Sequence, residues 1–447
     1  MTNDMTKGSP VSLILKFMIP MCLGNIFQQF YNIVDSIVAG QFIGVDALAA
    51  IGSTGSLMFL VTGWLNGLSS GFGILVAQCF GAKKYDTMRH YVAMSIYLNV
   101  AFVVVMTIGL SIGNEGILRL MNSPEDLLPS IKGYMAISYA GLFVTAAYNT
   151  LAAFLRALGD SKSPLYFLMI SAGINIVLDI VLIIVFGMGV EGCAVATVVA
   201  QGISAVLCYI YIRKKFEILW LSKKDFKISM YSIGKLLGLG IPMALQFSIT
   251  AIGGIIVQGA INVYGAVYMA GFSAAGKIQS IVASVFVSFG AAIATYVGQN
   301  HGAGQFQRVR KGVRYTQLMI LIWSVFMMVV IYFFGKYPIY IFVDPSETEV
   351  VEAAMTYFKT VIWAYPFLGS IFLYRNALQG MGYGLIPMMG GVFELVARWL
   401  IVMLVAGRTS FAGVCMSDPA AWIAALIPLI PYYIVKMRKI KQSKGEN

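Results

Sequence analysis

Charged side chains are scarce in this chain of 447 residues. Asp, Glu, Lys and Arg make up 11% of it, hydrophobic residues make up 59%, and the mean hydropathy is +0.81. A soluble domain has about 25% charged residues, so this composition excludes a soluble globular protein. The apolar residues form continuous runs, as in 177–186 and 318–334, whereas strands of an outer-membrane barrel alternate apolar and polar residues. The chain is therefore predicted to be an all-α polytopic membrane protein.

Histidine and cysteine are also rare. The two histidines, His90 and His301, fall in predicted loops, and no cluster has the spacing of a metal site or a catalytic nucleophile. The Gly-Ala-Gly sequence at 302–304 lacks the Gly-Lys-Ser/Thr ending of a phosphate loop. These absences predict a protein that is not an enzyme and uses no cofactor. We expect the scattered cysteines to be small hydrophobes without disulfides: Cys22, Cys79, Cys193, Cys208 and Cys415.

Apolar windows separated by charged or turn-rich segments predict twelve transmembrane helices, because a helical span needs about 20 apolar residues. The first window is not followed by a small-residue cleavage site, so we expect it to remain as a span. The predicted spans are 12–39, 47–79, 91–112, 133–155, 164–186, 192–212, 236–260, 267–297, 315–334, 353–374, 386–406 and 412–435.

The excess of basic residues reflects membrane topology. The net charge is +12, which in a soluble protein would favour a nucleic-acid partner. If the first loop is outside, 24 of the 31 Lys and Arg fall in inside segments and five fall outside, with Arg375 counted in an inside loop. By the positive-inside rule, this bias predicts a multi-pass protein of the plasma (inner) membrane, with both termini in the cytoplasm and no nucleic-acid partner.

The chain contains an internal repeat. Shifted by about 221 residues, the Ile-Pro-Met sequence at 19–21 meets the same sequence at 241–243, and Gly159 meets Gly380. Six spans separate equivalent points, so the halves are parallel repeats, and transporters built in this way commonly carry substrate between them. The predicted domains are an amino-terminal six-helix lobe at 1–212, a basic cytoplasmic linker at 213–235 and a carboxyl-terminal six-helix lobe at 236–447.

Proline interrupts the first predicted span of each half. Pro20 and Pro242 each remove a backbone hydrogen bond and kink the helix. Matched kinks predict hinges that move. The alternative is a static kink that packing tolerates, as in many membrane helices.

Five charged residues of the predicted spans are candidates for a functional site, because a charge inside the membrane costs at least about 3 kcal/mol and usually marks a substrate or ion path. They are Asp35, Asp179, Lys277, Glu394 and Arg398. Glu394 and Arg398 are four residues apart on one helix, so we interpret them as a neutralised structural pair, with a carboxyl-half site as the alternative. Lys277 either lines a central cavity or extends to the membrane surface.

Asp35 and Asp179 differ from the other three, because no basic residue lies within two helical turns of either in the sequence. Asp35 shares a helical stripe with Gln28 and Tyr31. Asp179 shares a face with Asn175. Two carboxylates among neutral oxygen donors can form an alkali-cation cage or hold a proton, whereas the alternative is two aspartates that only support packing. Further polar side chains in the predicted set are Asn32, Tyr134, Asn149 and Thr197.

These motifs resemble the MATE (multidrug and toxic compound extrusion) family, within the larger group of polysaccharide and lipid flippases. The resemblance covers the whole chain, and its motifs are weak singly but specific in this order. Besides Ile19-Pro20-Met21, they are Tyr31-Asn-Ile-Val-Asp35 followed by Gly40 and Ala47-Leu-Ala-Ala50, Gln78 to Gly81, Leu155-Arg156-Ala-Leu-Gly159-Asp160, Asn175-Ile-Val-Leu-Asp179, Glu394-Leu-Val-Ala-Arg398 and Asp418-Pro419-Ala-Ala-Trp422.

The resemblance implies twelve helices in two six-helix bundles that form V-shaped lobes. It also implies a secondary active multidrug efflux transporter, which exports organic, often cationic and aromatic compounds in exchange for protons or sodium ions. We expect the chain to act as a monomer on small organic substrates in the lipid bilayer.

Carried over by position, the resemblance implies an amino-lobe coupling site and a bend of the first helix at Pro20. The cation- or proton-coupling residues are Asp35, Tyr134, Asn149, Asn175, Asp179 and Thr197, of which Asp35, Asn175, Asp179 and Thr197 would hold sodium. The resemblance places Gln28 and Tyr31 in the substrate cavity, and Gln246 and Lys277 complete the set that we predict for it. Some branches of the family carry coupling acids in the seventh, eighth or tenth helix. This chain has Gln246 in the seventh and no acid in the tenth, so we place coupling in the amino lobe.

The predicted mechanism is alternating access between the halves. Ion binding at Asp35 and Asp179 bends the first helix near Pro20, narrows the outward-open cavity and releases the substrate. A flippase for lipid-linked sugars is the alternative. It would favour a strongly cationic cavity for a diphosphate, and only Lys277 and Arg398 are candidates for one.

Overall fold

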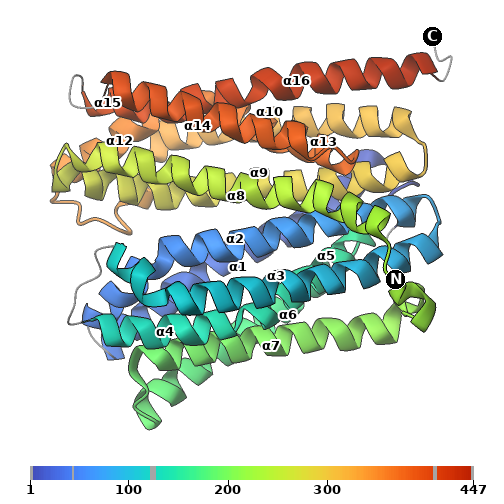
Figure 1. The fold of residues 1–447 in the computed structure, drawn as a ribbon. Helices are drawn as coiled ribbons and strands as arrows, with labels where there is room; N and C mark the ends of the chain where they lie inside the picture. The colour runs from blue at the N-terminus through green and yellow to red at the C-terminus, as the bar shows by residue number, and fades with distance from the viewer. Residues whose placement is uncertain (1–3, 43–44, 121–126, 406–409, 444–447) are drawn as a thin grey trace. The chain divides into compact units, whose positions relative to one another are not determined.

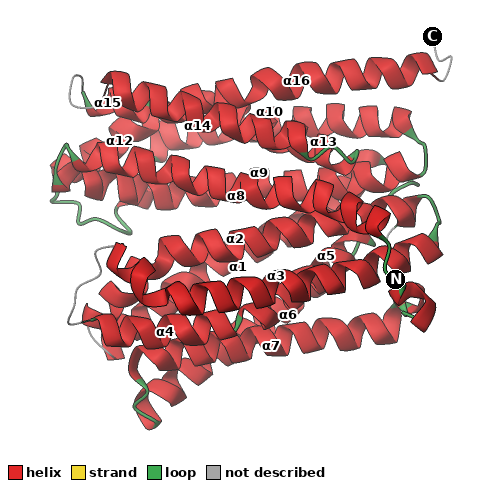
Figure 2. Cartoon of the chain, viewed as in Figure 1, coloured by secondary structure: helices red, strands yellow, loops and turns green. Residues whose placement is uncertain are grey.

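The fold is helical throughout the part of the chain that the structure describes. The computed structural model describes residues 4–42, 45–120, 127–405 and 410–443, with the backbone alone described at 31–42, 45–53, 56, 120 and 443. Every regular element among these residues is a helix (Figure 2). Ten of the described helices are long and apolar enough to cross a membrane, and a pair bent by 42° makes an eleventh. The predicted all-α polytopic fold is confirmed.

The helices follow the predicted spans in order (Figure 1). The amino half contains α1 (Pro10–Phe42), α2 (Val45–Gly81), α3 (Tyr85–Leu120), α4 (Leu128–Ala140), α5 (Leu142–Ala157), α6 (Lys162–Ile180), the π-helix η1 (Val181–Val185) and α7 (Gly189–Lys215). The connection contains the short 3₁₀ turns η2 (Glu217–Leu219) and η3 (Lys223–Phe226). The carboxyl half contains α8 (Met230–Asn262), α9 (Ala266–Gly302), α10 (Phe306–Phe334), α11 (Lys336–Ile339), α12 (Thr348–Val361), η4 (Ile362–Ala364), α13 (Tyr365–Gly380), α14 (Leu385–Val405), α15 (Phe411–Cys415) and α16 (Ser417–Ser443).

The first two helices have the same lengths in both halves, and the fourth span of each half is interrupted. The first helices, α1 and α8, have 33 residues each, and the second helices, α2 and α9, have 37 each. The fourth span is broken in both halves, between α4 and α5 and between α12 and α13. Gly141 separates α4 from α5, and Pro366 lies in the first turn of α13, where a missing N–H costs no helical bond. The repeat predicted from the sequence is therefore present in the fold.

The chain divides into two compact units, and two of the three boundaries between them fall inside helices. Unit 1 comprises Met1–Asp4 and Leu23–Ala244, and unit 2 comprises Met5–Cys22 and Leu245–Asn447. Each of these two boundaries comes two residues after a proline, Pro20 in α1 and Pro242 in α8. Each first helix therefore begins in one unit and ends in the other.

Within unit 1, the beginning of α8 packs closely on α2. A Cβ atom added to Gly71 would lie 2.7 Å from the Cα of Gly240, which is closer than real Cβ contacts. Leu236 and Leu239 are buried in the same apolar cluster as Leu68 and Phe72. Glycine at the crossing lets the two backbones approach, as in many membrane helix pairs.

Within unit 2, the segment before α1 is anchored to the turn between α9 and α10. The backbone N–H of Met5 donates to Gln299 Oε1 at 2.8 Å. The guanidinium of Arg308 donates to the carbonyl oxygens of Met5 and Gly8, at 3.1 and 2.9 Å. The first turn of the chain is thus held by side chains rather than left to fray.

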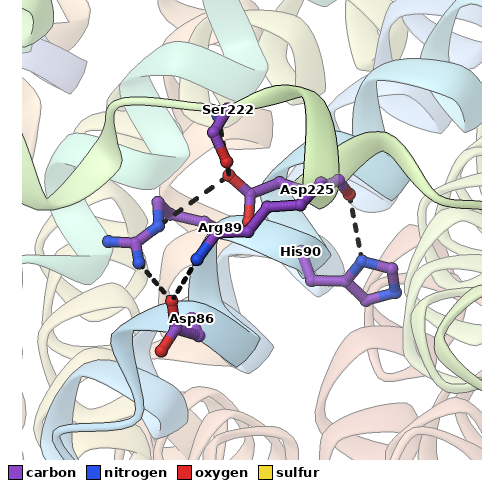
Figure 3. Close-up of polar contacts among 6 residues, drawn as sticks. Asp86, Arg89, His90, Ser222 and Asp225 are labelled. Carbon is purple, nitrogen blue, oxygen red and sulfur yellow. Dashed lines mark hydrogen bonds and ion pairs between the residues drawn. The ribbon is translucent and has the colours of Figure 1, made fainter.

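Within unit 1, the connection before α8 is anchored in the same manner to the start of α3 (Figure 3). Asp225 Oδ2 accepts from the backbone N–H and the hydroxyl of Ser222, at 2.7 and 2.8 Å. Arg89 lies 3.9 Å from this oxygen and also pairs with Asp86, and His90 Nδ1 lies 3.0 Å from the Asp225 carbonyl oxygen. The basic connection therefore has a defined conformation around one buried carboxylate.

The environment of Asp225 favours its ionised form. Burial alone would raise the pKa of this carboxyl, but hydrogen bonds from Ser222 and the charge of Arg89 hold the pKa below its usual value. A carboxyl with a lowered pKa in the folded state stabilises the fold above its unfolded pKa of about 3.9, and this contribution is lost as the pH falls through the lowered pKa.

Replacing Asp225 should therefore have an effect that depends on pH. At neutral pH, Asp225→Asn should lower the free energy of unfolding by about 1–3 kcal/mol, because charge-assisted hydrogen bonds are lost. The difference from wild type should shrink as the pH falls below about 4. Thermal unfolding in detergent at several pH values measures it. Asp86→Asn, at a carboxylate whose side chain is 80% exposed in the same cluster, should have a much smaller effect. A constant Asp225→Asn difference across the pH range would contradict this account.

Candidate functional site

The predicted coupling residues of the amino half lie on neighbouring helices of unit 1. Asp179 and Asn175 are fully buried on α6, with 0% and 1% of their surfaces exposed. The side-chain amide of Asn175 lies 3.4 Å from the hydroxyl oxygen of Thr197 on α7. The two helices also join through Ser171, whose hydroxyl donates to the Ala200 carbonyl at 2.6 Å. The structure therefore brings the α6 and α7 parts of the predicted site together.

The helix that carries Asp179 changes form beside it. α6 ends at Ile180, and the chain continues directly into the π-helix η1 at Val181–Val185. A π-helical turn shifts the hydrogen bonds by one residue, and such turns are frequent at functional sites. A buried carboxylate at this junction lies where the backbone is least regular along α6.

For the other predicted residues of the amino half, the structure describes the side chains of some and only the backbone of others. Tyr134 on α4 is half-buried and packs against the apolar cluster that contains Ile131 and Met135. Asn149 on α5 is half-buried. The side chains of Asp35 and Tyr31 lie outside the described residues, although both positions belong to α1.

The residues predicted for the substrate cavity occur in different surroundings. Gln28 is exposed on α1 in unit 1. Gln246 on α8 accepts a hydrogen bond at 3.1 Å from Gln379, which is buried on α13 in unit 2. Lys277 is exposed on α9 and lies 5.0 Å from the ring of Phe342, a cation–π contact at the loop before α12.

A buried polar network in unit 1 was missed by the sequence analysis. The hydroxyl of Thr150 on α5 lies 2.9 Å from that of Ser69 on α2 and accepts from the Asn99 amide of α3 at 3.0 Å. All three side chains are at least nine-tenths buried. An asparagine within the apolar window 91–112 was the available signal, but the predicted polar set was built around Asp35 and Asp179 and did not include it.

Unit 2 contains a buried network of four charged residues. Glu394 on α14 pairs through one oxygen with Arg398, at 3.1 Å, and through the other with Arg375 of α13, at 3.2 Å. Arg398 also pairs with Asp418 at the start of α16, at 3.2 Å. The second oxygen of Asp418 accepts from the hydroxyl of Tyr357 on α12, at 3.0 Å. The expected Glu394–Arg398 pair is confirmed, and it is part of a larger network.

Two members of this network correct the sequence analysis. Arg375 was counted as a loop residue, but it is 5% exposed within α13, where its charge meets Glu394. Asp418 was noted only as part of a terminal motif, and it supplies the second carboxylate. Hydropathy windows could not identify either residue, because Arg375 directly follows its predicted span, Asp418 is the second residue of α16, and contacts between helices cover both.

No group of three or more His, Cys, Asp or Glu in the described part of the chain could hold a metal ion. The described polar side chains of the predicted coupling set, Tyr134, Asn149, Asn175 and Thr197, are neutral hydroxyls and amides. Such oxygen donors suit a sodium ion or a protonated carboxyl rather than a transition metal.

The two related helical halves and the helices long enough to span a membrane define a polytopic membrane protein with an internal repeat. The family model described as MatE matches residues 20–181 and 242–405, once in each half. The chain therefore belongs to the MatE family, and the resemblance noted from its motifs is confirmed. Because this family consists of transporters, the chain is a membrane transporter and not an enzyme.

Known relatives agree with this assignment. The chain is 30% identical over 415 residues to the probable multidrug resistance protein YpnP of Bacillus subtilis (strain 168), covering 89% of this chain and 88% of the relative. It is 28% identical to the probable multidrug resistance protein YoeA of the same strain, over 97% and 95% of the two chains. A crystal structure of MATE in the bent conformation has the same fold, with a TM-score of 0.91, 21% identity and coverage of 99% and 98%.

Breaking the unit 2 network should be costly. Glu394→Ala leaves two buried guanidinium groups with one carboxylate, so we expect a loss of about 3–5 kcal/mol in the free energy of unfolding. Glu352→Ala, at an exposed acid on α12, is the matched control and should change stability by less than about 0.5 kcal/mol. Thermal unfolding of the purified variants compares them. Equal stability of the two variants would show that the network does not hold the carboxyl half together.

Proposed function

We propose that this protein is a secondary active multidrug efflux transporter. It exports organic, often cationic and aromatic compounds in exchange for protons or sodium ions, by alternating access. The names of its relatives, which are probable multidrug resistance proteins, support the class of substrate. The single observation that supports ion coupling in the amino half is the complete burial of Asp179 beside Asn175 on α6.

Burial of a carboxylate in a membrane span favours a role in coupling. Burying an ionised carboxylate away from water costs free energy, and this cost falls when a proton or a sodium ion neutralises the charge. The amide of Asn175 and the hydroxyl of Thr197 supply neutral oxygens for an alkali ion. Asp35, Tyr134 and Asn149 complete the proposed coupling set from α1, α4 and α5.

The two prolines are the proposed hinges. The moving bodies are the six-helix lobes at 1–212 and 236–447, joined by the basic connection at 213–235. α1 begins in unit 2 and continues in unit 1, and α8 does the reverse. A helix held by two bodies that move must bend between them, and Pro20 and Pro242 are where it can bend with the smallest loss of hydrogen bonds.

The proposed cycle links the ion and the substrate. Ion or proton entry at Asp179 favours a bent α1 and a weakened substrate site, so bound substrate must weaken ion binding by the same factor. Gln28, Tyr31, Gln246 and Lys277 are the proposed substrate-cavity residues. The protein acts as a monomer in the plasma membrane with both termini in the cytoplasm. A diphosphate flippase is less well supported, because Arg398 is already paired with two carboxylates.

Transport in reconstituted vesicles tests this function. Export of a fluorescent organic cation should be driven by an imposed proton gradient or by an imposed sodium gradient. Asp179→Asn and Asp35→Asn should each lower this gradient-driven export about 10-fold or more, since coupling factors of 5 to 150 are typical. Asp344→Asn, at an exposed loop carboxylate, should leave it unchanged. Export that stays at the wild-type rate in both Asp179→Asn and Asp35→Asn would refute coupling through this site.

A further inference from the structure

By the internal repeat, the unit 2 charge network corresponds in position to the proposed coupling site of unit 1. The third residue of α6 and of α14 is a proline, Pro164 and Pro387, which aligns the two helices. In this register Asn175, eleven residues after its proline, corresponds to Arg398, eleven residues after the other. The same positions in related halves therefore carry a neutral amide and a guanidinium.

Two further pairs follow from the repeat. Thr197 lies five residues after Gly192, and both are on α7. Asp418, on α16, likewise lies five residues after a glycine, Gly413 on α15. α7 and α16 are the last long helices of their halves. Tyr134 and Tyr357 both lie shortly before the break in the fourth span of their halves. The proposed coupling positions Tyr134, Asn175 and Thr197 thus correspond to Tyr357, Arg398 and Asp418.

The unit 2 residues of this set are in direct contact. Arg398 bonds to Asp418 through two nitrogens, with Nη2 at 3.2 Å and Nε at 3.3 Å, and the same Nη2 lies 3.1 Å from a carboxylate oxygen of Glu394. Tyr357 donates to the other oxygen of Asp418. A cationic group therefore lies among two carboxylates and a phenol, in the half where the repeat predicts a counterpart to the coupling site.

The backbone leaves room for this guanidinium. A Cβ added to Gly253 on α8 would lie 2.8 Å from a terminal nitrogen of Arg398. The side chains of Arg375, Glu394 and Arg398 are 6–10% exposed, and that of Asp418 is 15% exposed. Two guanidiniums balance two carboxylates, so removing Arg398 would leave one negative charge in a buried site.

We propose that the guanidinium of Arg398 is the built-in cation of a second cation site, formed by Glu394, Asp418 and Tyr357. The carboxyl half carries its counter-charge on the chain, so only the amino half exchanges a cation with solution. Removing Arg398 opens a site for a monovalent cation, and a free guanidinium ion matches its shape and charge. The inference rests on the proposed function only for the role of the amino half.

Rescue by guanidinium tests this proposal. Arg398→Ala should lower the Tm of the purified full-length protein, and guanidinium chloride at millimolar concentration should raise it again, saturably and by about 2 °C or more. Sodium chloride at equal ionic strength is the salt control. Arg308→Ala removes an arginine that bonds carbonyl and amide oxygens rather than carboxylates, and guanidinium should not raise its Tm.

A second set of variants keeps the test decisive if Arg398→Ala does not fold. Arg398→Gln retains most of the side-chain volume and should show the same rescue. Arg398→Ala with Asp418→Asn restores neutrality, so it should be more stable than Arg398→Ala and indifferent to guanidinium. If neither single variant folds, recovery of folded protein in the double variant supports the proposal, and its failure overturns it.

Two results would overturn the inference directly. One is a Tm of Arg398→Ala or Arg398→Gln that guanidinium does not raise. The other is an equal rise in Arg308→Ala. Because the assay measures stability and ion binding without transport, its outcome is independent of the vesicle test of the proposed function.

Discussion

A charge inside a membrane span must be neutralised within the protein, and this constraint organises the whole molecule. Water is absent from the hydrocarbon region, so an uncompensated ion there costs several kcal/mol. The chain satisfies this constraint in part by having few charged residues, which make up only 11% of it. The charges that remain in the helices then become the places where chemistry can occur.

The two halves satisfy the constraint differently on the same scaffold. In unit 2, Glu394 and Asp418 are balanced by Arg375 and Arg398, which come from the chain itself. In unit 1, Asp179 is buried one turn after Asn175 on α6, and the Asn175 amide lies 3.4 Å from the Thr197 hydroxyl. On our account, a proton or a sodium ion from solution neutralises Asp179 in the amino half, as the guanidinium of Arg398 neutralises carboxylate charge in the carboxyl half. A duplicated fold thereby acquires one exchangeable site and one permanent one.

Much of the fold could be predicted from the sequence because hydropathy depends on local residues. The predicted spans coincide with the helices, and Ile-Pro-Met at 19–21 and 241–243 marks the repeat. The breaks before α5 and α13 were not predicted, because their apolar windows run on through Gly141 and Pro366. The division of α1 and α8 between the two units was not predicted either. It depends on contacts between distant residues, such as that of Gly71 with Gly240.

The candidate site was predictable in part. Buried Asp179, Asn175 and the Glu394–Arg398 pair follow from polar residues within apolar windows. Arg375 and Asp418 do not, because Arg375 directly follows its predicted span, Asp418 begins α16, and both are covered only when other helices pack over them.

The central claim is that cation and substrate binding are linked through Asp179, and equilibrium binding tests it most directly. Affinity for a fluorescent organic cation would be measured on the purified protein while the proton or sodium concentration is varied. We predict that the wild-type affinity falls about 10-fold as the coupling ion saturates and that the affinity of Asp179→Asn does not change. An equal dependence on the ion in Asp179→Asn and in wild type would contradict the claim.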